Sequence, residues 1–127
     1  MRNLILAAGL AVSLSACAGS PTVVPKTPQQ ALVEAYGGFG TAVTAFNLYA
    51  SQRPFCDQPG AKAPPLCADR AIVIQGDAMA SKVADGLEIA NATLKATGAA
   101  DAQWATLANP LKAVQEFQVF VTKVRGQ

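Results

Sequence analysis

The chain has 127 residues, with ten basic and eight acidic side chains and no histidine. This near-neutral balance, without clustered Lys and Arg, offers no electrostatic attraction for nucleic acid, so we expect no nucleic-acid partner. Histidine is the commonest general base and metal ligand near neutral pH, and its absence excludes Ser-His-Asp and Cys-His mechanisms. The composition therefore predicts a non-enzymatic protein, with no catalytic residue, no cofactor and no metal site.

The start of the chain, residues 1–16, has the order of a signal peptide for export. Arg2 gives a positive start, an apolar run extends from Leu4 to Leu14, and small residues follow. A membrane-spanning helix needs roughly 20 apolar residues, so this run is too short to remain as an anchor. We expect residues 1–16 to be removed, which would leave a mature chain over 17–127, the size of one ordinary domain.

The next feature is Leu14-Ser15-Ala16-Cys17, which resembles the lipobox of bacterial lipoproteins. The resemblance covers only the signal peptide and the lipobox. It implies that Cys17 becomes the first residue, carries fatty acids such as palmitate, and anchors the chain in a membrane of the cell envelope, facing the periplasm. Stable anchoring takes more than one acyl chain. Many lipoproteins retained in the inner membrane of enteric bacteria have aspartate after the cysteine, whereas this chain has Ala18, which favours the outer membrane.

Residues 17–26 separate the lipid from the predicted domain, residues 27–127. They include two prolines and several small polar residues, and they lack a helical period. We expect them to form an extended and mobile tether, in which the nine residues after Cys17 reach at most about 30 Å.

Cys56 and Cys67 are the two remaining cysteines, near the ends of a proline-rich loop over residues 53–66. Export places them in an oxidising compartment, and two cysteines without histidine are too few for a zinc site. We therefore expect a Cys56–Cys67 disulfide, which stabilises the fold by roughly 3 kcal/mol in the chain-entropy account.

Apolar residues at helical spacing predict three helices. The first is expected over residues 28–52, opening with the capping box Thr27-Pro28-Gln29-Gln30, and the second over about 68–97. The third is expected to be capped by Asp101 and to kink or break near Pro110, with its main part ending near 125. The inward stripes comprise Leu32, Tyr36, Phe39, Val43, Phe46 and Ala50; Ile72, Gly76, Met79, Val83, Leu87, Ala90 and Leu94; and Leu111, Val114, Phe117, Val121 and Val124.

The short connections between these helices favour antiparallel neighbours. The sequence therefore predicts an all-α fold, an up-down-up three-helix bundle with a disulfide-closed loop between the first two helices. A complete break at Pro110 would turn the third helix into two. Gly37, Gly38 and Gly40 lie inside the first helix and are interpreted as a close helix crossing, with a soft spot as the alternative.

Some apolar residues fall outside the stripes and form a candidate partner-contact surface. In an up-down-up bundle they gather at the end that carries the disulfide, away from the tether. Scattered exposed apolar residues are the alternative interpretation. The candidate residues are Leu48, Tyr49, Phe55, Ile74, Val119 and Phe120.

Three functions fit these features. The first is a lipid-anchored interaction or structural module that contacts an envelope protein of unknown identity. The second is a periplasmic binder of an apolar ligand or lipid, with the small residues leaving a cavity. The third is an exclusion or immunity-type lipoprotein acting on an envelope receptor or enzyme, an analogy of format alone.

Overall fold

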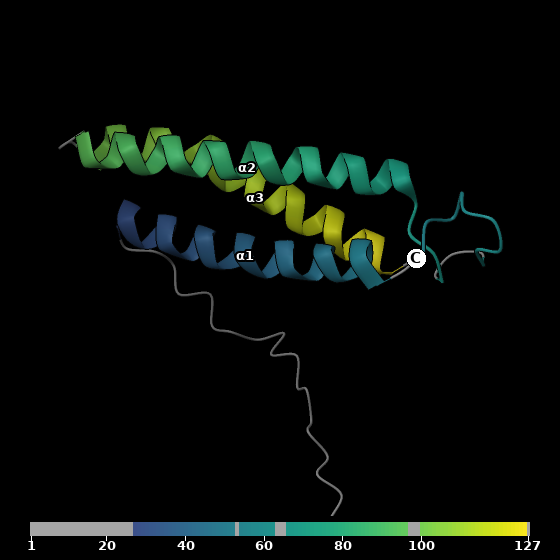
Figure 1. Cartoon of the computed structure of the whole chain (residues 1–127). Coiled ribbons are helices and arrows are strands. Elements are labelled where there is room, and N and C mark those ends of the chain that lie inside the picture. The colour runs from purple at the N-terminus through teal and green to yellow at the C-terminus, as the bar shows by residue number, and fades with distance from the viewer. Residues whose placement is uncertain (1–26, 53, 63–65, 97–99, 127) are drawn as a thin grey trace, which may run out of the picture.

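The computed structural model describes residues 27–52, 54–62, 66–96 and 100–126. The predicted signal peptide, Cys17 and the tether lie outside these residues. The described part forms three helices, α1 (Pro28–Gln52), α2 (Arg70–Ala96) and α3 (Ala100–Arg125). The helices run up, down and up, and each packs against the other two (Figure 1). The predicted all-α three-helix bundle is confirmed.

The predicted capping box opens α1. The backbone N–H of Thr27 donates to Gln30 Oε1 at 3.2 Å, and the backbone N–H of Gln30 donates to Thr27 Oγ1 at 3.2 Å. These reciprocal bonds satisfy two backbone groups that a helix start leaves without partners, and Pro28 supplies a preset helical backbone angle. The bounds of α1 agree with the prediction.

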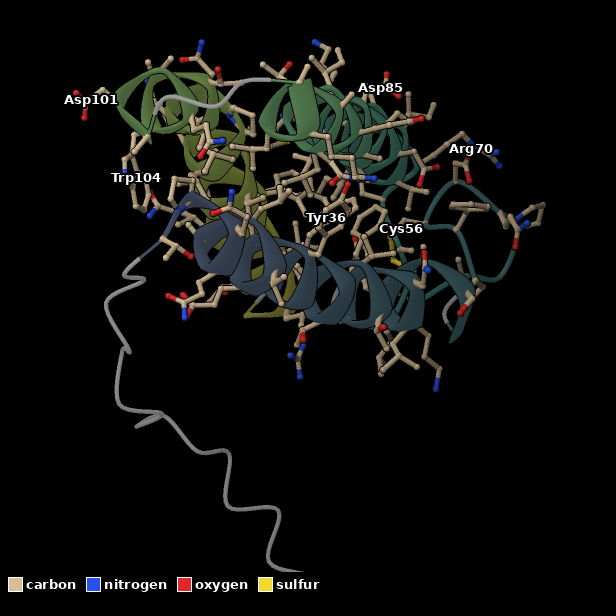
Figure 2. The ribbon with its side chains drawn as sticks, turned by 90° about the vertical axis from the view of Figure 1, so that its left-hand side faces the viewer. Tyr36, Cys56, Arg70, Asp85, Asp101 and Trp104 are labelled. Carbon is tan, nitrogen blue, oxygen red and sulfur yellow. A yellow bond between two sulfur atoms is a disulfide. The ribbon has the colours of Figure 1, made fainter. Side chains whose placement is uncertain are left out.

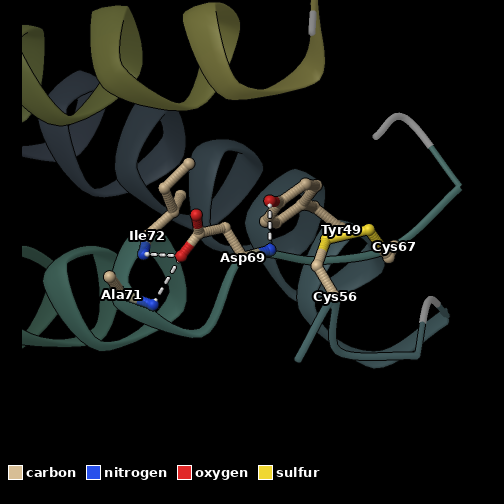
Figure 3. Close-up of a disulfide and its surroundings, with 6 residues drawn as sticks. All are labelled: Tyr49, Cys56, Cys67, Asp69, Ala71 and Ile72. Atoms are coloured by element: carbon tan, nitrogen blue, oxygen red, sulfur yellow. Dashed lines mark hydrogen bonds between the residues drawn. A yellow bond between two sulfur atoms is a disulfide. The ribbon is translucent and has the colours of Figure 1, made fainter. Parts of the chain in front are cut away.

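The start of α2 lies two residues later than predicted. Asp69 Oδ1 accepts hydrogen bonds from the backbone N–H groups of Ala71 (2.7 Å) and Ile72 (3.4 Å), so Asp69 is the N-cap (Figure 3). Ala68, the expected first residue, instead forms an isolated parallel bridge with Phe55. The aspartate cap competes with helix continuation and fixes the start at Arg70.

The third helix was predicted to kink or break near Pro110, and the structure shows no break. The helix is continuous from Ala100 to Arg125 with Pro110 inside it, and Asp101 lies in its first turn. Proline in a helix interior costs about 3 kcal/mol, because it lacks an N–H and its ring crowds the preceding turn. Gly86 of α2 lies opposite the ring, and even a Cβ there would be 3.9 Å from it. The Pro110 ring thus packs beside α2 without a close contact at this position.

The core is centred on an aromatic cluster that joins α1 to α3. Phe46 and Phe117 are almost completely buried, with ring centroids 6.1 Å apart. Phe120 lies 6.2 Å from Phe46, and Phe39 lies 5.8 Å from Phe117. Leu87 and Leu107 bring α2 and the first half of α3 into the same core.

The buried face of α1 differs from the predicted stripe. Tyr36, predicted to face inward, is 41% exposed, whereas Tyr49 is buried. The face turns toward Tyr49 because α1 packs against both α2 and α3, so its buried surface is wider than one stripe. Small residues fill the closest approaches, and the buried alanines are Ala31, Ala35 and Ala42.

Gly76 of α2 faces this cluster, and a Cβ at its position would overlap the Phe46 ring. We expect Gly76→Ala to lower the free energy of unfolding by about 1–2 kcal/mol, because overpacking outweighs the gain in helix propensity. The matched control is Gly86→Ala on the same helix, where the new Cβ meets Pro110 at an ordinary 3.9 Å. This control should raise the free energy of unfolding by about 1 kcal/mol. Urea unfolding followed by circular dichroism measures both, and equal changes would contradict the packing described.

Candidate interaction surface at the disulfide end

Cys56 and Cys67 form the predicted disulfide in the loop between α1 and α2 (Figure 3). Their Cα atoms are 5.0 Å apart, a separation ordinary for a disulfide. Cys67 and Ala68 are buried. The end of the bundle that carries this disulfide lies opposite the end that carries Asp101 and Trp104 (Figure 2).

Backbone hydrogen bonds hold the two sides of this loop together beside the disulfide. The N–H of Cys56 donates to the carbonyl of Ala68 at 3.0 Å, and the N–H of Ala68 donates to the carbonyl of Pro54 at 2.8 Å. The Tyr49 hydroxyl accepts a bond from the backbone N–H of Asp69 at 3.0 Å (Figure 3). The last turns of α1 are thus connected to the start of α2 by covalent and hydrogen-bonded contacts.

Two of the predicted partner-contact residues belong to the interior. Tyr49 is buried and its hydroxyl has a partner in the chain, so it is not part of an exposed surface. Phe120 is half-buried in the aromatic cluster, with its ring stacked on Phe117 at 6.4 Å between centroids. Both lie on flanks of their helices, and in a three-helix bundle a flank faces the second neighbour. A helical wheel with a single buried direction does not predict the burial of these two residues.

Phe55 is half-buried, with Arg70 lying over its ring. The guanidinium carbon is 4.2 Å from the ring centroid, a cation–π distance. Arg70 Nε also donates to Asp57 Oδ2 at 2.8 Å. The Arg70 guanidinium therefore covers the Phe55 ring and also bonds Asp57. The exposed group at this position is a paired charge and not an uncovered aromatic ring.

The Asp57–Arg70 ion pair is sensitive to acid, because Asp57 takes up a proton as the pH falls. The hydrogen bond from Arg70 lowers the pKa of Asp57 below its ordinary value of 3.8, and the same bond raises the pKa of Arg70. Because the folded-state pKa of Asp57 is depressed, the stabilisation is present above pH 3.8 and is lost as the pH falls through the lowered pKa. Both side chains are more than half exposed, so the contribution is small.

Leu48, Ile74 and Val119 are exposed, at 51%, 63% and 69%. They lie on the outward sides of α1, α2 and α3, each toward the disulfide end of its helix, and they point to different sides of the bundle. Leu48 lines a shallow hollow with Gly40 and Arg125. Val119 lines a separate hollow with Gln118 and Lys123. Their role in binding a partner stays a prediction.

Several exposed apolar residues were not among the predicted contacts, and Ile89 of α2 is one of them. Leu66 directly precedes Cys67 in the loop, and Val33 lies near the start of α1. Val33 falls outside the apolar stripe of its helix, a signal that could have identified it from the sequence. Leu66 lies in a loop without periodicity, so no comparable signal marked it.

Comparison with known proteins finds no matching family model, no similar curated protein and no similar solved structure. Among the described residues, no three Cys, Asp or Glu side chains come together as a metal site. Within the same part of the chain, no helix is long and apolar enough to cross a membrane.

The hydrogen bond to Tyr49 gives a direct test of how α1 and α2 are joined. Tyr49→Phe removes the acceptor for the Asp69 N–H and should lower the free energy of unfolding by about 1 kcal/mol. Tyr36→Phe is the matched control, because Tyr36 lies exposed on the same helix, and it should change stability by less than about 0.5 kcal/mol. Chemical unfolding of both variants measures this, and equal effects would contradict the assignment.

Proposed function

We propose that this chain is a small, non-enzymatic lipoprotein of the bacterial cell envelope that acts by protein contact in the periplasm. The observation that carries the proposal is Leu14-Ser15-Ala16-Cys17, which closes the apolar run that begins at Leu4. Lipid on Cys17 anchors the domain, and Ala18 favours the outer membrane as its location. The absence of histidine from the whole sequence supports a role other than catalysis.

The disulfide supports export. A Cys56–Cys67 bond with ordinary Cα spacing is stable in an oxidising compartment such as the bacterial periplasm, and such bonds are rare in the cytosol. Export would thus lead both to lipid attachment at Cys17 and to oxidation of the Cys56 and Cys67 thiols.

The geometry of the bundle supports contact with a partner away from the membrane. The proposed tether leads into α1 at Pro28, and the disulfide loop lies at the opposite end of α1 (Figure 1). Because α1 has 25 residues at about 1.5 Å each, these ends are separated by roughly 37 Å. We call the disulfide end the distal end, because it is farther from the proposed tether. Exposed Ile74 and Leu66 lie toward this end and supply apolar surface for a partner.

A role as a binder of apolar ligands has less support. It requires the small residues to leave an interior cavity. Gly38 instead faces the Gln118 side chain of α3, and Gly76 faces the Phe46 ring, so neighbouring side chains occupy both positions. Gly37 and Gly40 face open space on the outside of α1. An exclusion or immunity role is a special case of the anchored interaction module.

The anchor is tested by metabolic labelling. Cells that produce the full chain in the presence of an alkyne analogue of palmitate should incorporate the label, and the protein should sediment with membranes. Cys17→Ser should abolish labelling, because it removes the acylated sulfur. The double variant Cys56→Ser/Cys67→Ser is the control and should keep the label. An unlabelled wild-type protein, or one that retains residues 1–16, would overturn the proposal.

The distal contact is tested separately by a pair of isoleucines on α2. Ile74 and Ile89 are similarly exposed, but they lie roughly 22 Å apart along the helix. With a photo-crosslinking amino acid at Leu66, Ile74→Glu should reduce crosslinking to an envelope protein at least about tenfold, as expected for a central contact residue. Ile89→Glu should leave it unchanged. Equal crosslinking in both variants would argue against a distal contact surface.

A further inference from the structure

The outward face of α1 carries far less charge than those of the other two helices. Glu34 is the only Asp, Glu, Lys or Arg among the 25 residues of α1, whereas α2 has six such residues and α3 has five. Solvent-facing helix surfaces normally carry charged side chains. An uncharged face can be removed from water at low cost, so this difference marks α1 as a candidate interface.

We define the α1 outer face by six exposed residues, which are Val33, Gly37, Gly40, Thr41, Thr44 and Leu48. Apolar side chains lie at both ends, with Val33 70% and Leu48 51% exposed. Between them, a Cβ at Gly37 or at Gly40 would meet nothing within 4 Å. A second helix can therefore approach the backbone of α1 closely at its middle.

The polar groups on this face already have partners for their hydrogens. The Thr41 hydroxyl donates to the carbonyl of Gly37 at 3.0 Å, and the Thr44 hydroxyl donates to the carbonyl of Gly40 at 2.9 Å. Covering these hydroxyls leaves no donor unsatisfied, which avoids the usual cost of burying polar groups. The face is thus suited to burial although it contains threonine.

The spacing on the α1 outer face is symmetric about a point between Gly40 and Thr41. Gly37 precedes Gly40 by three residues, and Thr44 follows Thr41 by three. Val33 precedes Gly40 by seven residues, and Leu48 follows Thr41 by seven. If two copies of α1 pack antiparallel about this point, Val33 meets Leu48 of the second copy, and Gly37 meets Thr44 of the second copy. This is the self-complementary pattern that a two-fold interface requires.

The charged residues Glu34 and Arg125 also fit the antiparallel arrangement. Arg125 of α3 lines the hollow beside Ala45 and Leu48 of α1. In the antiparallel pair, Glu34 of one copy lies level with Asn47 of the other, and so beside that copy's Arg125. The ion pairs formed within the described residues are Arg70–Asp57 and Lys112–Glu116, so Glu34 and Arg125 are both available. Two-fold symmetry makes the contact twice.

We propose that the α1 outer face binds the same face of a second copy of this chain, forming an antiparallel, two-fold symmetric dimer. The helix pair spans residues 33 to 48, or roughly 22 Å, a contact smaller than that of obligate dimers. The dimer is therefore reversible and favoured where copies are concentrated. All the residues that form it lie in the bundle, so the proposal does not depend on the lipid anchor. In the dimer the tether end of each copy lies beside the disulfide end of the other, so dimerisation is an alternative to the upright contact proposed above.

Engineered cysteines test the arrangement. Two differently tagged full-length chains, one with Val33→Cys and one with Leu48→Cys, are produced in the same cells and treated with a short, membrane-permeable bis-maleimide. The mixed pair should give a crosslinked product that contains both tags. Two Val33→Cys chains should give none, because their cysteines lie roughly 22 Å apart in the antiparallel pair.

The controls are the chain without an added cysteine and a chain with Ile89→Cys, which is exposed on α2. No mixed product above these controls would overturn the dimer. A product between two Val33→Cys chains as strong as the mixed product would overturn the antiparallel arrangement.

A charge exchange tests the ion pairs in the same cysteine background. Glu34→Lys and Arg125→Glu should each lower the mixed product by on the order of tenfold, because each places like charges together twice per dimer. Glu34→Lys combined with Arg125→Glu in the same chain should restore it. Glu88→Lys on α2 is the control and should have no effect. Failure of the double variant to restore the product would contradict the pairing.

Discussion

The bundle depends on how closely its helices approach around the Phe46 ring. Gly76 has no side chain, and the ring of Phe46 fills that position of α2 while it also contacts Phe117 and Phe120 of α3. One aromatic side chain thereby joins all three helices. Alanine supplies much of the remaining buried surface, and alanine favours helix without filling much volume. A small domain of this kind depends on a few large buried side chains and on covalent constraint.

The disulfide supplies that constraint at the end where the aromatic cluster stops. Beyond Phe46, the last large buried side chain of α1 is Tyr49, and its hydroxyl bonds the residue that caps α2. The Cys56–Cys67 bond closes the loop directly outside this contact (Figure 3). The two ends of the bundle therefore differ. One receives the chain from the proposed tether, and the other is closed by the disulfide and carries the proposed partner contact.

Local sequence signals predicted most of the fold. The capping box predicted the start of α1, and Pro54 limited its end. Of the seven residues in the predicted α2 stripe, five are buried, and Ile72 and Met79 are half-buried. The disulfide was predicted from the expected export and the cysteine count. The start of α2 was misplaced because Asp69 caps the helix, and the other errors arose where a neighbouring helix decides the outcome. Pro110 stays within α3, where it packs beside Gly86 of α2, a contact that no local pattern reveals.

Part of the candidate surface was also predictable from the sequence. Exposure of Leu48, Ile74 and Val119 followed from their positions outside the apolar stripes. The burial of Tyr49 and Phe120 did not, because each helix in the bundle faces two neighbours and a single wheel direction describes only one of them. The two-fold pattern on α1 is present in the sequence, but it gains meaning only once Arg125 is known to lie beside Leu48.

If Cys17 carries lipid and the loop of the exported bundle is oxidised, the protein has no free thiol, and a thiol count in intact cells tests this. Cells are treated with a membrane-permeable maleimide carrying a mass tag, and the protein is then separated without reduction. The account predicts that none of the three cysteines reacts, because one sulfur is alkylated by lipid and two are joined. Mild reduction before labelling should make two react. Reaction of any cysteine without reduction would contradict the account.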